Sequence, residues 1–404
     1  MQDGFWERLE LGDRNAVIKK RIIAFYVHNG SSTITDLSKV LDLSIPTVTK
    51  FVMEMCEEGY LGCYGKLETS EGRFPNLYGL NPESGFFIGV DINKFAINIG
   101  IINFCGNLMS LEMGIPYQLE NTNEGLDSLC EHVKDFIKKC DIDKKKILNI
   151  GINVSGRVNP DSGYSFSLFN FSEKPLTEVL AEKIGYPVSI DNDTRAMTYG
   201  EFFTGNVNGE RNIIFVNVSW GLGIGMIIDG KIYTGKSGFS GEFGHIHAFD
   251  NEILCHCGKK GCLETEVSGS ALHRILLERM SRGESSILSH RMTSQKDKPL
   301  TLDEIIDAVN KEDLLCIEII EEMGQKLGNH IASLINIFNP ELIIIGGKLS
   351  LTGDYIMQPI KTAVRKYSLN LVNKDSSIRL SKLLGKAGVI GACIQARNHK
   401  LGLQ

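Results

Sequence analysis

The residues best suited to chemistry are a histidine and three cysteines in the second half of the chain. His245 is followed, after nine residues, by Cys255, Cys257 and Cys262. Three thiolates and one imidazole form the Cys₃His set that holds structural zinc in a tetrahedral shell, and four protein ligands leave no position open for catalysis. The spacing therefore predicts a closed structural zinc site made by these four residues.

The histidine ligand is less constrained than the three sulfurs, because His247 and His256 are spare imidazoles nearby. An alternative interpretation is that the cysteines are buried thiols or a redox pair. The remaining cysteines are scattered singly along the chain, which is typical of small buried side chains in long intracellular proteins.

The composition indicates a globular protein of two or three domains, with 404 residues, 42% hydrophobic and 23% charged. No apolar run approaches the ~20 residues that cross a bilayer, and the acidic N-terminal segment lacks the apolar region of a signal peptide. We therefore expect a cytoplasmic protein that does not contact the membrane. The net charge of −6 argues against broad non-specific affinity for nucleic acid.

The N-terminal region predicts three short helices. Apolar residues at helical spacing predict a helix over 15–28. Thr35 can cap a second helix over Asp36–Leu41, and Ser44 can cap a third that ends near Glu58. After this helix the sequence alternates like a hairpin, which would form a wing.

Such a third helix, with polar side chains on its early exposed face, matches the docking mode of a helix-turn-helix. The candidate DNA contacts lie on this helix and near the tip of the wing: Thr47, Thr49, Lys50, Lys66 and Arg73. Residues 1–80 carry 9 Lys and Arg against 11 Asp and Glu, so DNA binding must depend on local charge placement. The alternative is a three-helix packing module that does not contact DNA.

From about Phe86 the pattern changes to short β-branched runs that alternate with helical stretches, which indicates an α/β architecture with buried strands. The expected strands are FFIGVDI, AINIGII, ILNIGINV, NIIFVNV and ELIIIGG, and the expected helices cover 124–140, 175–184, 194–203, 268–282 and 315–338. Residues 86–106 and 212–230 each contain a strand, a glycine-containing turn and another strand. A duplicated α/β domain would leave this similarity.

Several motifs resemble known families. The segment TITDLSKVLDLSIPTVTKFVMEMCEEGYL resembles a bacterial winged helix-turn-helix, and SGFSGEFGHIHAFDNEILCHCGKKGCLETEVSGSAL resembles the signature of the ROK family of repressors, open reading frames and sugar kinases. The ROK resemblance extends from about Gly85 to Arg397 and includes GVDI, INVSGRVNP, DNDTRAMTYGE, FNPELIIIGG and LGKAGVIGACIQA.

The resemblance implies an α/β fold, with a two-lobed actin/hexokinase (ribonuclease-H-like) domain preceded by an all-α winged helix-turn-helix. The expected parts are a DNA-binding domain at 1–82, a first lobe at 83–200 joined by a C-terminal helix at about 385–404, and a second lobe with the zinc site at 201–384. The family binds a sugar in the cleft between the lobes. We also expect a homodimer or homotetramer.

The resemblance also implies the sugar contacts, at Arg157, Asn170, Asn192, Asp193, Glu242, His245 and Glu264. These side chains can exchange bidentate hydrogen bonds with hydroxyl groups. His245 would bind zinc through one ring nitrogen and sugar through the other. Without the motif, Glu242 and Glu264 could equally be surface carboxylates.

Asp193 occupies the position of the general base in the family's kinases. The phosphate turns depart from the kinase pattern, however. Residues 91–95 are DINKF where the kinases have Asp-x-Gly-Gly-Thr, and residues 219–223 are SWGLG in place of Gly-Thr-Gly-x-Gly. Bare glycine backbone is what cradles phosphate, and phosphoryl transfer depends mainly on positioning. We therefore expect no catalytic residues.

The expected function is a sugar-responsive repressor of carbohydrate-utilisation genes, with operator DNA, a monosaccharide or sugar phosphate, and zinc as its ligands. The main alternative is an ATP-dependent sugar kinase of the ROK family. A third class is a sugar sensor that contacts another protein instead of DNA. The sequence leaves open which sugar is the effector and whether it releases or strengthens DNA binding.

Overall fold

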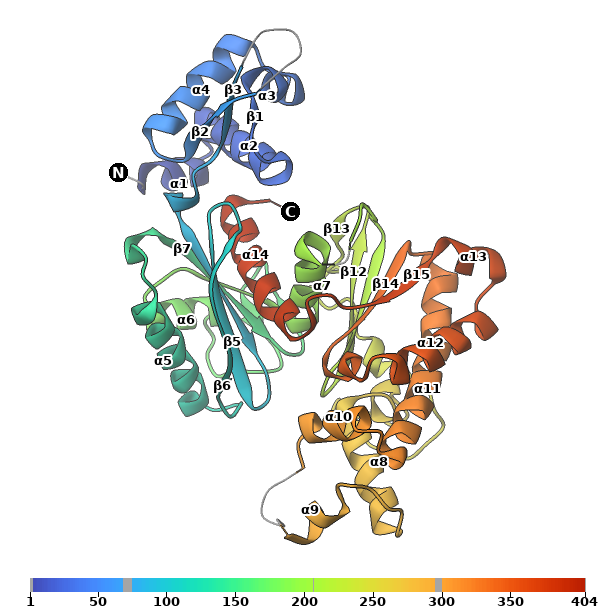
Figure 1. The fold of residues 1–404 in the computed structure, drawn as a ribbon. Coiled ribbons are helices and arrows are strands. Elements are labelled where there is room, and N and C mark those ends of the chain that lie inside the picture. Colours follow the sequence, from blue (N-terminus) through green and yellow to red (C-terminus); the bar gives the residue numbers. More distant parts are fainter. Residues whose placement is uncertain (1–2, 68–74, 206, 295–299, 404) are drawn as a thin grey trace. The chain divides into compact units, whose positions relative to one another are not determined.

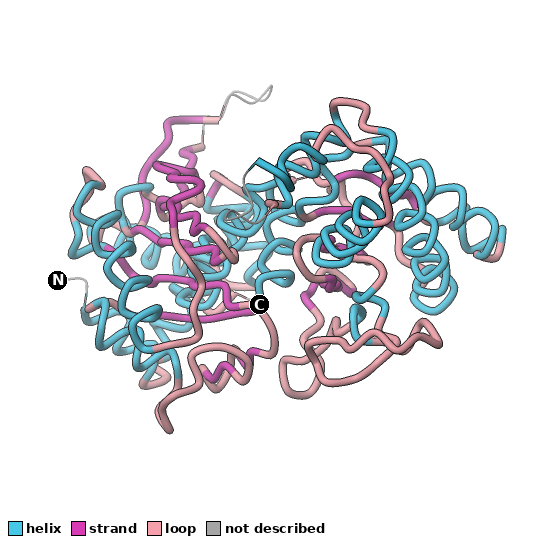
Figure 2. The backbone as a smooth tube through the Cα atoms, turned by 90° about the horizontal axis from the view of Figure 1, so that it is seen from below, coloured by secondary structure: helices cyan, strands magenta, loops and turns pink. Residues whose placement is uncertain are grey.

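The computed structural model describes residues 3–67, 75–205, 207–294 and 300–403 (Figure 1). The chain divides into two compact units. The first comprises Met1–Ile152, Phe171–Ser189 and Cys393–Gln404, and the second comprises Asn153–Asn170 and Ile190–Ala392. Each unit contains a five-stranded sheet, and helices accompany the strands (Figure 2). The α/β prediction is therefore confirmed, and the three-part domain division stays a prediction.

Four helices open the first unit: α1 (Asp3–Glu10), α2 (Arg14–Asn29), α3 (Ile34–Leu41) and α4 (Ile45–Glu57). The last three confirm the predicted helices, whereas α1 was not predicted. The predicted cap of α3 was wrong. Thr33, not Thr35, accepts the Asp36 N–H at 3.2 Å, because a capping oxygen lies three residues before its donor. Ser44 caps α4 as predicted, accepting the Thr47 N–H at 3.3 Å.

A small antiparallel sheet follows these helices. It has the strand order β1-β3-β2, with β1 at Ser32–Thr33, β2 at Leu61–Lys66 and β3 at Asn76–Leu80. The β2–β3 pair confirms the predicted hairpin, and β1 adds a strand to it. The part of the predicted wing that carries Arg73 lies outside the described residues.

One hydrophobic core runs through the first unit. It joins buried residues of the helix-turn-helix, such as Leu37 and Val48, to Phe87 and Phe104 of the neighbouring α/β region. The rings of Tyr60 and Phe104 lie 6.2 Å apart across this junction. The helices therefore pack onto the α/β part of this unit and do not form a separate core.

The two five-stranded sheets have the same topology. The first has the order β10-β7-β4-β5-β6 and the second β13-β12-β11-β14-β15. The strands of each sheet can be numbered from one to five along the chain. The first sheet then has the order five, four, one, two, three, and the second sheet has the same order read in reverse. The predicted duplication is thus confirmed.

The strands of the first sheet are β4 (Phe86–Ile92), β5 (Ala96–Asn103), β6 (Leu108–Pro116), β7 (Ile147–Val154) and β10 (Val188–Asn192). Those of the second are β11 (Ile213–Val218), β12 (Leu222–Ile228), β13 (Lys231–Ile232), β14 (Leu342–Gly346) and β15 (Ser377–Leu380). The larger helices are α5 (Asn123–Lys139), α6 (Leu176–Ile184), α7 (Asp193–Thr204), α8 (Gly269–Ser281), α10 (Leu302–Asn310), α11 (Leu314–Phe338), α12 (Asp354–Tyr367) and α14 (Ala387–Leu401).

The second sheet is covered on both faces, as its continuous apolar strands require. Alternate residues of a strand point to opposite faces. Ile214 and Val216 of β11 therefore join the core that contains α11, whereas Ile213 and Phe215 pack with Met197 of α7. This packing fixes α7 against the sheet, and α7 begins at the candidate site.

The smaller elements include a hairpin of β8 (Val158–Asn159) with β9 (Tyr164–Ser165), and the helices α9 (Ser289–Ser294) and α13 (Asn370–Asp375). Among the residues that the structure describes, no helix is long and apolar enough to cross a membrane.

Candidate functional site

The four predicted metal ligands come together in the second unit. One ligand atom from each of His245, Cys255, Cys257 and Cys262 lies within 4.8 Å of the others. Cys255 Sγ lies 3.6 Å from His245 Nδ1, and the sulfurs of Cys257 and Cys262 are 3.6 Å apart. A tetrahedral ion with zinc-like bond lengths holds its ligands about 3.6–3.8 Å apart. The cluster therefore has the donor set and spacing to hold a metal ion.

The loop that carries the sulfurs is folded tightly. Backbone bridges join Leu254 to Lys260 and His247 to Cys262. Gly258 has a φ of 86°, a left-handed conformation that lets the chain reverse between the second and third cysteines. Among the described residues, His245 is the histidine that groups with all three cysteines, whereas His256 groups with His245 and Glu264 and His247 with neither set. This grouping favours His245 as the histidine ligand.

The thiols of Cys255 and Cys257 differ in how easily they ionise. Burial raises the pKa of the Cys255 thiol to about 12. Partial burial also disfavours the Cys257 thiolate, but the Lys259 backbone N–H and the two neighbouring thiols donate to its sulfur, so its pKa is lowered overall. A bound metal requires deprotonated sulfurs and would overcome the burial effect at Cys255.

His245 presents its two ring nitrogens to different partners. Its Nδ1 faces Cys255, and its Nε2 lies 3.7 Å from Glu242 Oε2. A 3₁₀ turn over Phe243–His245 places Glu242 and His245 on the same side of the chain. One imidazole thus joins the sulfur cluster to a carboxylate.

Glu264 follows Cys262 on a second 3₁₀ turn, Leu263–Thr265. Its buried carboxylate accepts the Leu222 N–H at 2.8 Å, and its other oxygen lies 2.9 Å from His256 Nδ1. The cysteine loop therefore fixes the position of this carboxylate directly.

The start of α7 carries the next two candidates. Asn192 caps the helix by accepting the Arg195 N–H at 3.1 Å, and its amide donates to the Gly156 carbonyl at 3.0 Å. Asp193 accepts a hydrogen bond from Ser155 Oγ at 2.8 Å. Both side chains are therefore held in place by the loop that follows β7.

Contacts through Thr194 link this region to Glu264. The hydroxyl of Thr194 accepts a hydrogen bond from Asn217 Nδ2 at 2.9 Å, and a Cβ placed on Gly223 would lie 3.1 Å from the same oxygen. Strand β12 thus begins directly beside α7, and its first residue, Leu222, donates to Glu264.

Arg157 and Asn170 lie in the loops around the β8–β9 hairpin, and both are exposed. The backbone of Arg157 is fixed, because its N–H donates to Ser167 Oγ at 3.0 Å and its carbonyl accepts the Phe166 N–H at 2.9 Å. None of these hydrogen bonds joins Asn170 to the other candidate sugar contacts.

Arg195 is a structural residue that the sequence did not single out. It is 2% exposed, and its guanidinium donates to the carbonyls of Val158 at 3.1 Å and Gly238 at 2.5 Å. Its Nε donates to Asp191 at 2.6 Å. Arg195 thus connects the hairpin of Arg157 to the loop before Glu242. Arg195 lies in the DNDTRAM motif, but no local sequence pattern indicates that a cationic side chain in a helix will be buried.

The first altered phosphate turn lies between β4 and β5 in the first unit. Asp91 is buried, and one of its carboxylate oxygens accepts hydrogen bonds from the amides of Asn93 and Asn98, both at 3.0 Å. The Lys94 ammonium lies 5.1 Å from the centre of the Phe95 ring. Three side chains therefore occupy a turn where glycine would leave the backbone bare.

The second altered turn precedes β12. Its Ser219 and Trp220 carbonyls accept the Gly269 and Ser270 N–H groups at 2.7 and 3.0 Å. These donors are at the N-terminus of α8, where free backbone N–H groups would otherwise favour an anion. The Trp220 ring lies 5.9 Å from the ring of His273. Backbone hydrogen bonds to the start of α8 and the indole of Trp220 therefore occupy this turn.

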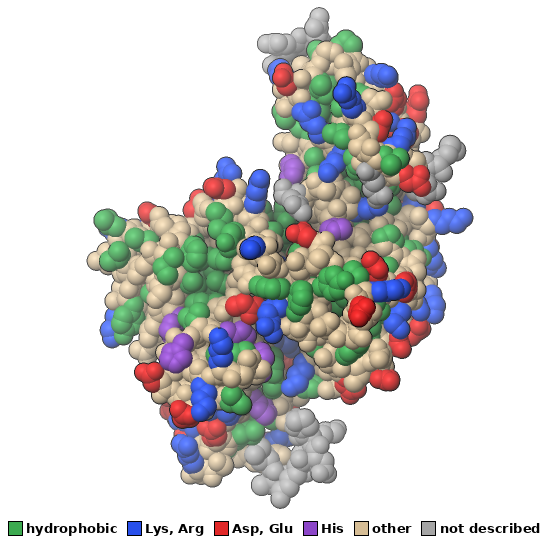
Figure 3. Space-filling model, turned by 180° about the vertical axis from the view of Figure 1, so that it is seen from behind, with side chains coloured by type: hydrophobic (Ala, Val, Ile, Leu, Met, Phe, Trp, Pro, Cys, Tyr) green, Lys and Arg blue, Asp and Glu red, His purple; other side chains and the backbone are tan. Residues whose placement is uncertain are grey.

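The candidate DNA contacts on α4 and β2 differ in whether their side chains already bond within the helix or are exposed. The Thr47 hydroxyl lies 2.7 Å from the Ser44 cap, and the Thr49 hydroxyl donates to the Ile45 carbonyl at 2.8 Å. Lys50 is exposed, with Glu54 at 3.9 Å, and Lys66 is exposed at the end of β2. Figure 3 shows basic and acidic side chains interspersed on the face it presents.

The fold and site define a class: a winged helix-turn-helix joined to a duplicated α/β domain with a His/Cys cluster beside polar side chains. Residues 87–399 match the model of the ROK family, and residues 17–61 match a model described as winged helix-turn-helix DNA-binding. The chain belongs to the ROK family.

Its relatives include regulators and kinases. The chain is 32% identical over 362 residues to a xylose repressor of Caldicellulosiruptor bescii, which covers 89% of this chain and 90% of the relative. It is 30% identical to a glucokinase of Halalkalibacterium halodurans over 76% of this chain and 93% of the enzyme.

Among solved structures, a ROK family transcriptional regulator described as a homologue of the Escherichia coli MLC protein superposes with a TM-score of 0.78 at 26% identity. The match covers 95% of this chain and 98% of that one. The expected fold and family are therefore confirmed.

Proposed function

We propose that the chain is a sugar-responsive transcriptional repressor that binds operator DNA. One observation carries the proposal: a helix-turn-helix segment precedes a ROK domain whose two phosphate turns are filled by side chains and internal hydrogen bonds. The similarity to a xylose repressor and to a solved ROK regulator supports it, and makes xylose the first effector to test.

We assign the sugar site to the second unit, with contacts from Arg157, Asn170, Asn192, Asp193, Glu242, His245 and Glu264. In support, His245 and Glu242 face each other, and Thr194 contacts link the start of α7 to the strand that holds Glu264. The carboxylates of Glu242 and Glu264 can accept hydrogen bonds from sugar hydroxyls. Because Asn192 caps α7, it would contribute mainly by shaping the site.

We assign zinc to His245, Cys255, Cys257 and Cys262, since Cys₃His sets with closed shells are typical of structural zinc. The ion would hold Glu264 and His245 in place rather than act on the sugar. DNA contacts are assigned to α4 and to the wing, with Thr47, Thr49, Lys50, Lys66 and Arg73 as the candidates. A homodimer would present two such helices to an operator with two half-sites.

A sugar kinase is the second candidate. It is favoured by Asp193, which keeps the position of a general base and is oriented by Ser155, and by the glucokinase relative. The filled phosphate turns weigh against it, because phosphoryl transfer relies on positioned backbone N–H groups and charge.

Calorimetric titration of the full chain with xylose and glucose, with and without Mg-ATP, separates the two candidates. The repressor proposal expects sugar binding that does not depend on ATP, together with no sugar-dependent ADP release in a coupled assay. Sugar-dependent ATP consumption at rates typical of kinases, about 1–100 s⁻¹, would establish the kinase instead.

A further inference from the structure

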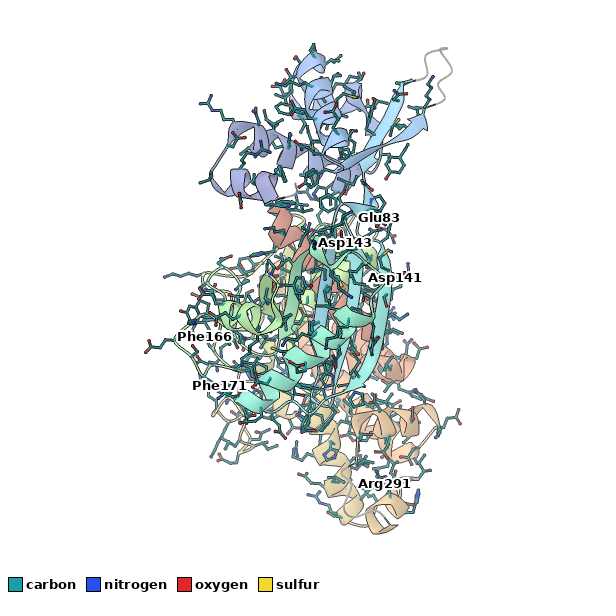
Figure 4. All side chains as sticks on the ribbon, turned by 90° about the vertical axis from the view of Figure 1, so that its left-hand side faces the viewer. Glu83, Asp141, Asp143, Phe166, Phe171 and Arg291 are labelled. Carbon is teal, nitrogen blue, oxygen red and sulfur yellow. The ribbon has the colours of Figure 1, made fainter. Side chains whose placement is uncertain are left out.

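Two exposed aromatic side chains lie beside the candidate sugar contacts. Phe166 is 50% exposed and Phe239 is 36% exposed. Their ring centres are 5.4 Å apart with the planes at 86°, so the edge of one ring meets the face of the other. Figure 4 labels Phe166, which lies on a loop of the second unit. Together these two rings are called the aromatic pair below.

The aromatic pair comes from the two loops that carry candidate sugar residues. Phe166 follows the β8–β9 hairpin, and its N–H donates to the carbonyl of Arg157 at 2.9 Å. Phe239 lies three residues before Glu242 in the loop after β13. The rings are therefore placed next to the candidate site by the same backbone that places its polar groups.

These two loops are fixed relative to each other. The buried Arg195 guanidinium donates to Val158 in the hairpin and to Gly238, which directly precedes Phe239. A Cβ on Gly238 would lie 2.6 Å from the Val158 carbonyl oxygen, so the two backbones are in close contact. The aromatic pair is thus a preorganised feature of this unit and not a chance meeting of two mobile side chains.

The chemistry of this surface suits a saccharide ring. The C–H groups on the face of a pyranose pack against the electron-rich face of an aromatic ring, while its hydroxyls need polar partners at the rim. Arg157 and Glu242 are both exposed and can supply such partners, because they lie on the same two loops as Phe166 and Phe239. An apolar ring face with polar groups on the same loops is therefore available beside the candidate sugar site.

We propose that the aromatic pair is a second saccharide subsite, so that the effector is a disaccharide or longer oligosaccharide. This inference rests on the proposed function, because the first ring must occupy the site assigned above. The second ring would stack on Phe166 or Phe239 and extend from the first toward the hairpin. The pair would then make the regulator respond to a breakdown product of a polysaccharide rather than to the free monosaccharide.

The test is a calorimetric titration of the full-length, zinc-loaded chain with four probes: xylose, xylobiose, glucose and cellobiose. We expect at least one disaccharide to bind about tenfold or more tightly than its own monosaccharide. The double substitution Phe166→Ala and Phe239→Ala should remove that advantage and leave the monosaccharide affinity within about twofold. Phe166→Trp, which keeps an aromatic face, should retain it.

Tyr367→Ala is the matched control, since Tyr367 is a similarly exposed aromatic residue at the end of α12 in the same unit. It should change none of the four affinities. Zinc content and thermal unfolding show that each variant is folded.

Equal affinity for mono- and disaccharides, or a disaccharide advantage that survives the double substitution, overturns the subsite and leaves the sugar-responsive function standing. Failure of all four probes to bind overturns the subsite and contradicts the proposed sugar site as well.

Discussion

The Nε2 atom of His245 lies 3.7 Å from a carboxylate oxygen of Glu242, while Nδ1 of the same ring faces the sulfur of Cys255 at 3.6 Å. A single side chain therefore belongs both to the candidate metal cluster and to the candidate sugar site. Loss of a metal from this cluster should therefore change the affinity for sugar through the His245 ring.

Metal removal tests this coupling. Stripping the chain with a chelator, or replacing Cys257 by Ser, should lower sugar affinity about tenfold to a hundredfold, because the ring of His245 and the backbone before Glu264 lose their anchor. Metal analysis and calorimetry measure the two effects. Cys63→Ser is the control, since Cys63 is exposed in β2 far along the chain from the cluster. Unchanged sugar affinity in a metal-free, folded chain would contradict the shared role of His245.

Substitutions at Glu264 separate sugar binding from folding. Glu264→Gln keeps an oxygen that accepts the Leu222 N–H but loses the charge, so sugar affinity should fall while the melting temperature changes little. Glu264→Ala leaves that buried N–H without its acceptor and should also reduce the unfolding free energy by about 1–3 kcal/mol.

Glu252→Gln, on an exposed residue of the same loop that pairs with Lys260, should affect neither quantity. Normal sugar affinity in Glu264→Gln would show that this carboxylate serves the fold alone.

Lys50→Ala tests the DNA surface. Loss of a phosphate contact should weaken binding to a selected operator and lower the dependence of log K on log salt by about 1 for each contact. Fluorescence anisotropy at several salt concentrations gives both values. Lys138→Ala is the control, because the two lysine side chains are 68% and 70% exposed. A drop of the same size in both variants would mean that α4 makes no special contact.

The packing of α14 on α7 gives a prediction about stability. A Cβ on Gly391 would overlap the Ala196 carbonyl oxygen, so Gly391→Ala should force the helices apart and cost about 1–3 kcal/mol or more of unfolding free energy. Gly385→Ala is the control, since a Cβ there meets nothing within 4 Å. Denaturant unfolding compares the two, and equal stabilities would show that the helices adjust freely.

Much of this structure could be predicted from the sequence because its signals are local. Apolar runs such as FFIGVDI and NIIFVNV became central strands, and the spacing of Cys255, Cys257 and Cys262 led to the metal cluster. Ser44 marked the start of α4, because a capping side chain acts within the first turn of its own helix.

The features that escaped prediction depend on contacts distant in the chain or on choices between equal candidates. Thr33 and Thr35 are both suitable caps, and only the backbone geometry selects Thr33. The eight-residue helix α1 is too short to show periodicity, and it forms because Phe5 and Trp6 are buried against other parts of its unit. Arg195 binds carbonyls 37 and 43 residues away, which no local pattern reveals.

The most direct test of the central claim is the affinity of the full chain for its own operator, selected from random duplexes, measured with increasing xylose, glucose and their disaccharides in the absence of ATP. The proposal predicts that one of these sugars changes the dissociation constant about tenfold or more, which corresponds to about 1.4 kcal/mol of coupling between the two ligands. Operator affinity that stays constant while one of these sugars is bound would contradict the proposal.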